Sequence, residues 1–297
     1  MLKRIWLIIL MNAAILIIAN LFLYILSLFW VNVNYASYGW LFIFCLVASF
    51  VGSTISLFIS KWLAKTTYWV RVVTQADYNS LSEKEKLVFD VVKDLSERNH
   101  IKMPEVGIYQ SDEPNAFATW ATKNSSLVAV SSGLLDSMSK EAIEWVVWHE
   151  MAHVLNGDMV TMTILQWILD TFVMFFAKVI ARIVSNFVDE QYATWVRIWL
   201  DIVLQIVFWI LASFIAMWFS RYREYKADAG SAYYVGKEKM IAWLQALKDM
   251  QNKMHEADPK YASMQISAPN SKWLFSRLLS SHPELDDRIK ALEDLKI

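Results

Sequence analysis

Two long uncharged runs near the N-terminus constrain the fold more than any other feature of the sequence. Residues 5–30 and 40–60 contain no charged side chain, and each is long enough to cross a hydrocarbon core, which takes about 20 apolar residues in a helix. In lipid a chain must satisfy its backbone hydrogen bonds internally, so such runs form transmembrane helices. The sequence therefore predicts two N-terminal spans. The first run ends without a small-residue cleavage site, so we expect it to be retained.

Two later apolar stretches, residues 159–183 and 196–219, predict a transmembrane hairpin, although charged side chains interrupt both. A carboxylate such as Asp170 at the centre of a span costs about 2.5–3.5 kcal/mol on insertion. Such residues could line an ion or proton path. We favour the interpretation that they face other helices or lie in short, tilted spans, because no span repeats the acidic or arginine pattern of a pump or voltage sensor.

Basic residues set the orientation of the predicted spans. Lys3 and Arg4 precede the first span, and Lys61 and Lys65 follow the second, so both of these ends are expected on the cytoplasmic side. The soluble segments and both termini then lie in the cytoplasm as well. The formal net charge of −1 gives no basic field, which argues against nucleic acid as a partner. The apolar runs predict the lipid bilayer as the surrounding of the spans.

This arrangement divides the chain into four parts. Residues 1–65 form two N-terminal spans, residues 66–157 the first part of a soluble domain, residues 158–219 the hairpin and residues 220–297 the second part of that domain. The expected fold class is a mainly α membrane protein, in which four transmembrane helices carry a cytoplasmic α+β domain. Cys45 is the single cysteine, so any metal must be held by histidines and carboxylates.

Local signals mark the elements of residues 66–157. Ser82 and Glu85 form a capping-box pattern ahead of a helix that should end near Asn99. The stretch VGIYQ predicts a strand, and AFATWA and LVAVS, which flank the polar turn TKNSS, predict a hairpin. A further helix should begin at Ser139 and end at Asn156 and Gly157.

The motif VWHEMAH, residues 147–153, lies inside that last helix. His149 and His153 are one turn apart, so both imidazoles project from one face and can share a metal at about 2.0 Å. Glu150 points beside the metal, where a general base for water belongs. The alternative is a chance match in an apolar helix. A metal is favoured because the surroundings bury these polar side chains, and buried histidines and glutamates need partners.

A catalytic zinc takes three protein ligands, so a third must come from elsewhere in the chain. The candidates are Asp158, Glu224, Asp228, His255 and His282. The predicted hairpin leaves the cytoplasmic face just after Asp158 and returns at Ser220, which favours Glu224. Asp228 lies one turn further on, where it could orient a ligating histidine. The basic residues of SRYREYKAD also fit a helix at the lipid headgroups, and the two interpretations are compatible.

The chain resembles the HtpX family of bacterial membrane zinc metallopeptidases, relatives of the CAAX prenyl proteases. The matching stretches are NAFAT, LVAVSSGLL, HEMAHVLNGDMVTM, SRYREYKADAGSA and SHPELDDRI, in that order. The resemblance implies a gluzincin-like zincin domain with one Zn²⁺ per chain, His149, His153 and Glu224 as zinc ligands, Glu150 as catalytic base and Asp228 as a supporting residue. It also implies the bacterial cytoplasmic (inner) membrane and a role in stress response and protein quality control, with misfolded or damaged membrane proteins as substrates.

The resemblance suggests two further assignments. Residues Asn115, Ala116, Phe117, Ala118 and Thr119 could bind a substrate as an added strand through main-chain hydrogen bonds, although an ordinary hairpin would explain them too. Family members commonly have glycine where this chain has Trp120, so we expect a bulkier rim.

His282, in an HP motif, could stabilise the oxyanion of the tetrahedral intermediate. The alternative is a helix-capping or packing role, with Arg288 in a surface ion pair. His100 and His255 match nothing in the family and are interpreted as surface residues.

The predicted reaction is peptide hydrolysis by zinc-activated water with Glu150 as general base. A membrane scaffold or transporter with a structural metal is one rival, but a structural zinc is normally closed by a fourth protein ligand. In an intramembrane protease the HExxH motif should lie within a span, whereas here it precedes one. A dedicated prenyl-protein protease stays open as a third alternative.

Overall fold

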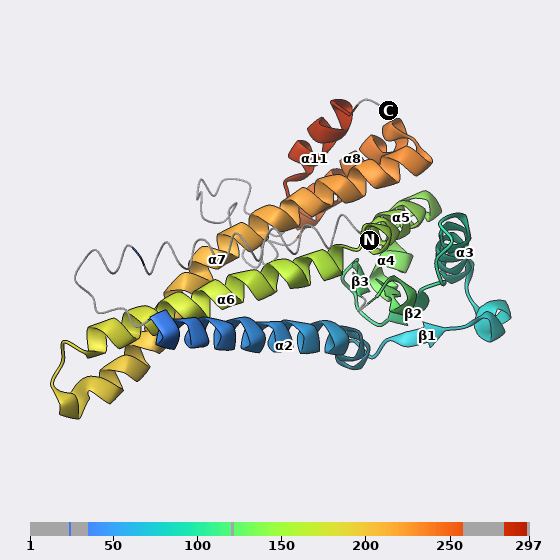
Figure 1. Ribbon diagram of the computed structural model, residues 1–297. Helices are drawn as coiled ribbons and strands as arrows, with labels where there is room; N and C mark the ends of the chain where they lie inside the picture. The colour runs from blue at the N-terminus through green and yellow to red at the C-terminus, as the bar shows by residue number, and fades with distance from the viewer. Residues whose placement is uncertain (1–23, 25–34, 120–121, 258–281, 296–297) are drawn as a thin grey trace. The chain divides into compact units, whose positions relative to one another are not determined.

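The computed structural model describes residues 24, 35–119, 122–257 and 282–295. Its helices and strands, in chain order, are α2 (Tyr35–Thr67), β1 (Arg71–Val73), the 3₁₀ helix η1 (Gln75–Ser80), α3 (Glu83–Arg98), β2 (Glu105–Tyr109), β3 (Ala116–Thr119), η2 (Lys123–Ser125), β4 (Leu127–Ser131), α4 (Ser132–Ser137), α5 (Lys140–Asn156), α6 (Asp158–Ser185), α7 (Glu190–Val235), α8 (Lys237–Ala257) and α11 (Leu285–Glu293) (Figure 1).

The described residues divide into two compact units. Residues 35–55 and 163–215 form one, which we call the helical unit. Residues 56–162 and 216–295 form the other, the mixed unit, which contains all the strands.

Three helices of the described residues are long and apolar enough to cross a membrane. They are α2 from Ser37, α6 over its whole length, and α7 as far as Tyr233. They contain the second predicted span and both arms of the predicted hairpin, and they indicate a membrane protein. The predicted span at residues 5–30 lies outside the described residues except for Tyr24, and so does Trp120.

In the helical unit, α2 and α6 pack through apolar side chains. The rings of Phe42 and Phe175 meet edge to face with their centroids 5.3 Å apart, an arrangement that aromatic pairs prefer. Three charged residues in the spans have polar partners: Lys178 Nζ lies 2.8 Å from Asp201 Oδ2, and the Gln166 amide donates to Asp170 at 2.8 Å. These contacts support the interpretation that the charges face other side chains.

The mixed unit is built on a four-stranded sheet with the order β1-β2-β4-β3. Strands β3 and β4 are antiparallel, with Thr119 opposite Leu127, which confirms the predicted hairpin. Strand β2 lies parallel to β4, and β1 adds antiparallel to β2. Strand β3 therefore forms an edge, and within the described part of the chain it pairs with β4 alone.

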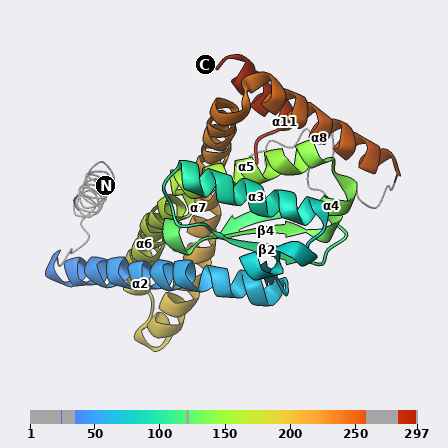
Figure 2. The same ribbon diagram turned by 90° about the vertical axis from the view of Figure 1, so that its right-hand side faces the viewer.

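Helices α3 and α5 pack against each other and against the same sheet (Figure 2). The predicted ends of both helices are confirmed. Ser82 and Glu85 form the capping box of α3, and the Ser139 hydroxyl accepts a hydrogen bond from the Ala142 amide at 3.2 Å at the start of α5. Gly157 ends α5 with a φ of 71°, a left-handed conformation that glycine adopts at little cost. Helix α6 begins at the next residue.

Helix α7 continues without a break from the membrane-spanning stretch into the mixed unit. Its residues from Ala216 onward belong to the mixed unit, in which Glu224 of α7 lies 3.3 Å from His149 of α5 and helices α8 and α11 pack against each other. The long helix thus carries its C-terminal residues to the helix that bears the HExxH motif.

Candidate metal centre

The two histidines of α5 lie side by side and are buried. Four residues separate them along the helix, so they occupy successive turns of one face. Their ring centroids are 4.8 Å apart and the rings are nearly perpendicular. The Nε2 atoms of His149 and His153 are 3.2 Å apart, so both point at one place.

Glu224 of α7 meets this pair. Its Oε2 lies 3.3 Å from Nε2 of His149, and its Oε1 lies 3.4 Å from Nε2 of His153. Among the described residues, His149, His153 and Glu224 form the one group whose ligand atoms could hold a metal ion, with all of these atoms within 4.8 Å of one another. The structure thus brings together the three residues that the sequence favoured as ligands.

The spacing of these donor atoms fits a small divalent ion. Ligands about 2.0–2.1 Å from a tetrahedrally coordinated zinc ion stand about 3.3–3.4 Å apart. The two Nε2 atoms are 3.2 Å apart, and each lies beside a different oxygen of Glu224: His149 is 3.3 Å from Oε2 and His153 is 3.4 Å from Oε1. Two imidazoles and one carboxylate are donors that zinc accepts, and three protein ligands leave one position for water or substrate, as in catalytic sites.

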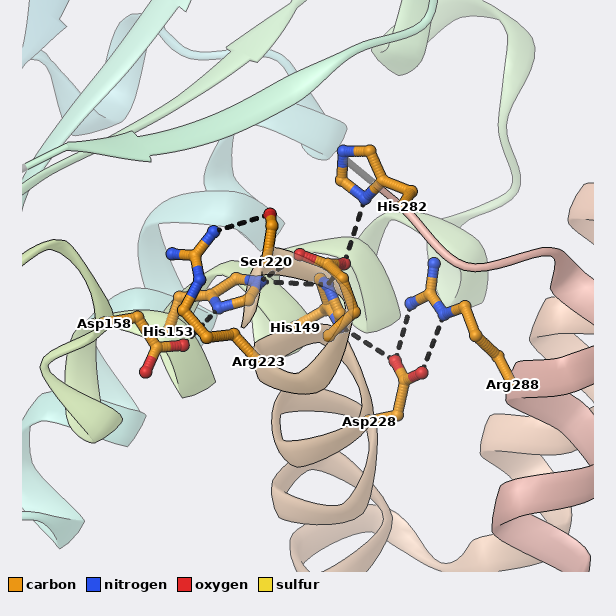
Figure 3. Close-up of polar contacts among 9 residues, drawn as sticks. His149, His153, Asp158, Ser220, Arg223, Asp228, His282 and Arg288 are labelled. Carbon is orange, nitrogen blue, oxygen red and sulfur yellow. Dashed lines mark hydrogen bonds and ion pairs between the residues drawn. The ribbon is translucent and has the colours of Figure 1, made fainter. Parts of the chain in front are cut away.

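A carboxylate lies at the Nδ1 atom of each imidazole, on the side of the ring away from the metal position. Nδ1 of His149 lies 3.1 Å from Asp228 Oδ1, and Nδ1 of His153 lies 2.6 Å from Asp158 Oδ2 (Figure 3). Asp158 accepts the Nδ1 proton of His153, and Asp228 lies within ion-pair distance of Nδ1 of His149. Both contacts leave Nε2 directed at the metal position, and carboxylates on the Nδ1 side are found in many zinc sites. Asp228 has the supporting position that the sequence predicted. Asp158, a candidate third ligand, instead lies on the Nδ1 side of His153.

Arg288 is the residue that sequence reasoning misjudged. The predicted alternative of a surface ion pair is wrong, since Arg288 is only 5% exposed. Its Nε donates to Asp228 Oδ2 at 2.7 Å and its Nη2 to Oδ1 at 2.6 Å (Figure 3). A signal was present: Arg288 precedes buried Leu292 by one turn of α11, so it lies on the apolar face of that helix.

The centre carries a negative field that suits a cation. Asp158, Glu224 and Asp228 are buried around the two histidines, and Arg288 is paired with one of these acids. Burial alone would lower the pKa of His153, but its contacts with Asp158 and Glu224 outweigh this effect and raise that pKa to about 10. A divalent ion at Nε2 would neutralise the same carboxylates.

Glu150 follows His149 on α5 and is partly exposed. Burial raises the pKa of its carboxyl above the usual value, although His153 and His149 oppose the shift. A carboxyl with a raised pKa beside a metal centre is the kind of group that exchanges protons during catalysis.

His282 lies at the edge of the centre, just ahead of α11. Its Nδ1 is 3.1 Å from Glu224 Oε2, while its side chain is 67% exposed (Figure 3). The N-cap of α11 is Glu284, so His282 does not cap that helix. Its position beside Glu224 is compatible with a catalytic role.

Other predicted residues lie farther from the ligands. Ala116 to Thr119 form β3, which contacts α5, and Asn115 precedes this strand. His100 is exposed just after α3, as expected. His255 lies in α8, and its side chain is outside the described part of the chain.

Comparison with known proteins agrees with this geometry. A model of Peptidase family M48 matches residues 82–296. The chain belongs to peptidase family M48. It is 46% identical over 299 residues to the Protease HtpX of Actinobacillus pleuropneumoniae serotype 5b (strain L20), covering 99% of this chain and 100% of that protein. It is 41% identical to the Protease HtpX homolog of Methylacidiphilum infernorum (isolate V4), over 99% of both chains.

A solved structure shares the fold. The crystal structure of S. mikatae Ste24p matches with a TM-score of 0.61 and 22% identity, covering 99% of this chain. This chain spans 65% of the length of that one. With its family shown, the M48 chain is a metalloprotease and therefore a hydrolase, which confirms the resemblance and the enzyme class predicted from the sequence.

Proposed function

We propose that the chain is an integral membrane zinc metalloendopeptidase, with His149, His153 and Glu224 as ligands and Glu150 as general base. One observation carries the proposal: ligand atoms of two imidazoles and one carboxylate lie within 4.8 Å of one another, while Asp228 and Asp158 lie at the Nδ1 sides of the two imidazoles. Three ligands with an open fourth position favour catalysis over a structural metal.

The chain's own residues supply the proton transfers. When bound, Zn²⁺ contributes Lewis acidity, which polarises the scissile carbonyl and acidifies water. The Glu150 carboxylate takes a proton from the attacking water and passes it to the leaving nitrogen. Asp228 and Asp158 keep the imidazoles oriented during both steps, and Arg288 holds Asp228 in place.

Substrate binding is assigned to the free edge of β3. An extended peptide would add to this edge through main-chain hydrogen bonds, which are independent of side-chain identity and would allow broad specificity. His282 would then donate a hydrogen bond to the developing oxyanion. Its contact with Glu224 at 3.1 Å supports this role, because it keeps the imidazole beside the centre.

The proposed biological role is quality control of membrane proteins in a bacterial cytoplasmic membrane, with the mixed unit in the cytoplasm. Two observations support it. Three helices suit a bilayer, and the relatives that match over nearly their full length are named Protease HtpX. Unfolded or damaged membrane proteins expose extended segments, and such segments are what an edge strand can bind.

Degradation of an unfolded test protein by the purified full chain in detergent tests the proposal. We expect Glu150→Gln to bind as much zinc as the wild type and to lose cleavage by about 10²–10⁴-fold. Glu141→Gln is the matched control, because Glu141 is an exposed residue of the same helix. A chelator should stop the wild type.

Cleavage by Glu150→Gln at the wild-type rate would exclude the general-base role. If the wild type retains zinc but does not cleave, and chelation lowers its thermal stability, the metal is structural and the scaffold interpretation replaces this one.

A further inference from the structure

The ends of the membrane-spanning helices supply parts of the metal centre itself. Asp158, which holds His153, is the first residue of the apolar helix α6. Glu224 lies in α7, a second helix that is apolar enough to cross a membrane. Two of the groups at the centre are therefore carried by helices that are apolar enough to cross a membrane.

Helix α7 carries a marker of the bilayer surface. Trp218 and Tyr222 are exposed and stacked, with their ring centroids 6.3 Å apart, and Lys226 Nζ lies 4.7 Å from the Tyr222 ring. Aromatic and basic side chains in this order along a helix suit the headgroup region. Glu224 is six residues beyond Trp218, about 9 Å along the helix axis.

The end of α2 gives a second marker. Phe58, Ile59, Trp62 and Leu63 are all exposed on one face of its last turns. The helix then stops at Trp69, which has a φ of 51° and is 88% exposed, while the Val70 amide donates to the Lys65 carbonyl at 3.0 Å. This is a helix stop that usually uses glycine. A tryptophan held outward there suits the membrane interface.

The opposite face of the α2 end holds the substrate edge of the sheet. The Thr119 hydroxyl, at the end of β3, donates to the Ser60 hydroxyl at 3.0 Å. Lys61 lies 2.9 Å from Glu105 at the start of β2, and Lys65 pairs with the same carboxylate. The hydrogen bond of Thr119 joins β3, and the two ion pairs join β2, to the last turns of α2.

Aromatic packing adds to this connection. The Tyr68 ring lies 5.4 Å from the ring of Phe117 in β3 and 5.2 Å from that of Tyr109 in β2. Strand β3 is thus fixed at both its end and its middle by residues 60–68. Its Thr119 end contacts Ser60, in the turns of α2 that carry the exposed aromatic residues.

We infer that the site selects polypeptide segments that leave a membrane span directly, and that α2 sets the distance of the first cut from the bilayer. This inference rests on the proposed function of β3 as the substrate edge. A segment leaving the lipid beside α2 would meet the Thr119 end of β3 first. The short rise from Trp218 to Glu224 needs only about three extended residues, so the first cut should fall within about ten residues of the span.

The test uses a designed single-span protein with an unstructured tail, reconstituted with the full-length enzyme in vesicles of phosphatidylcholine and phosphatidylglycerol. Mass spectrometry maps the first cut for tails of two lengths. The same tail, supplied as a free peptide, measures the rate of peptide cleavage without a membrane span. We expect one cut position, fixed relative to the span, and cleavage at least about tenfold faster than for the free tail, because the span concentrates the tail at the site.

First cuts that spread along the tail, or that keep a fixed distance from its free end, would overturn the inference. Failure of the proposed function looks different: the free tail would also stay intact, and the wild type would behave as Glu150→Gln.

Variants at the α2 end test the positioning itself. Ser60→Ala combined with Lys61→Ala should broaden the cut positions on the anchored tail, while the set of cut positions on the free tail stays as in the wild type. Thr66→Ala is the matched control, because its hydroxyl donates only to carbonyls of its own helix. Cut positions as sharp in the double variant as in Thr66→Ala would show that α2 does not set the distance.

Discussion

Helix α5 and the membrane-spanning part of α7 are both apolar nearly all round, yet they lie in different surroundings. Ten residues of α5 are buried, among them Ile143, Val147 and Met151. Only 6% of the most apolar window of α7 is buried inside the protein. An all-round apolar pattern therefore predicts removal from water, and helix length decides between protein and lipid: α5 has 17 residues and α7 has 46.

The two helices are alike where they break their apolar pattern. The buried polar residues of α5 are His149 and His153, and those of the α7 continuation include Glu224 and Asp228. All four meet at the metal centre. Polar residues in an apolar helix are expensive to bury, and here each of the four has a partner on the other helix.

Removing a ligand from either helix should have the largest effect. We expect His149→Ala and Glu224→Ala each to lose bound zinc and to lower peptidase activity by about 10³-fold or more, since the metal contributes several kcal/mol to the transition state. Metal analysis and peptide cleavage measure both. His100→Ala, at an exposed histidine, should change neither. If Glu224→Ala retained its full zinc content, α7 would supply no zinc ligand.

Breaking the ion pair between Arg288 and Asp228 should have the second-largest effect. Arg288→Met leaves the buried Asp228 carboxylate without its guanidinium, which should cost about 3–5 kcal/mol of stability and weaken zinc binding by about 10–100-fold. Denaturant unfolding and competition with a zinc chelator check these values. Lys290→Met, at an exposed position of the same helix, is the control. Equal zinc affinity in the two variants would contradict the positioning role of Arg288.

A matched pair of isoleucines tests the comparison of surroundings directly. Ile143 of α5 is fully buried, whereas Ile206 of α7 is 56% exposed. Ile143→Ala should destabilise the mixed unit by about 2–5 kcal/mol. Ile206→Ala should cost less than about 1 kcal/mol, because lipid tails replace the lost contacts. Unfolding in detergent, followed by tryptophan fluorescence, gives both values, and equal losses would mean that Ile206 packs against protein.

The smallest expected effect concerns the start of α5. Ser139→Ala removes the hydroxyl that accepts from the Ala142 amide and should cost about 1 kcal/mol. The same unfolding experiment measures it. Ser80→Ala, at an exposed serine that does not cap α5, is the control, and an equal change in both would exclude a capping effect.

Local chemistry predicted much of this fold. Ser82, Ser139 and Gly157 mark helix ends because caps depend on a few neighbouring residues, and the one-turn spacing of His149 and His153 needs only helix geometry. The parallel pairing of β2 with β4 was not predicted, nor was strand β1. Such pairings join distant segments and leave no local signal.

Long-range partners in the site were equally hard to predict. Asp158 was weighed as a ligand, but Gly157 turns the chain so that its carboxylate meets the Nδ1 side of His153. Arg288 needed the position of Asp228, 60 residues away in the sequence. Hydropathy placed the end of the predicted span near Ser220, whereas helix α7 continues to Val235. A change in side-chain polarity ends an apolar span, but the backbone hydrogen bonds of the helix can continue past it.

The direct junction of α5 and α6 at Gly157 limits how the enzyme can be simplified. Deleting every apolar helix would remove Asp158, and with it the acceptor that fixes the tautomer of His153. A water-soluble minimal protease must therefore retain the first turn of α6 as far as Met162 and the end of α7 from Ala216, where the mixed unit begins again. The hairpin between those two residues is open to replacement by a short polar linker.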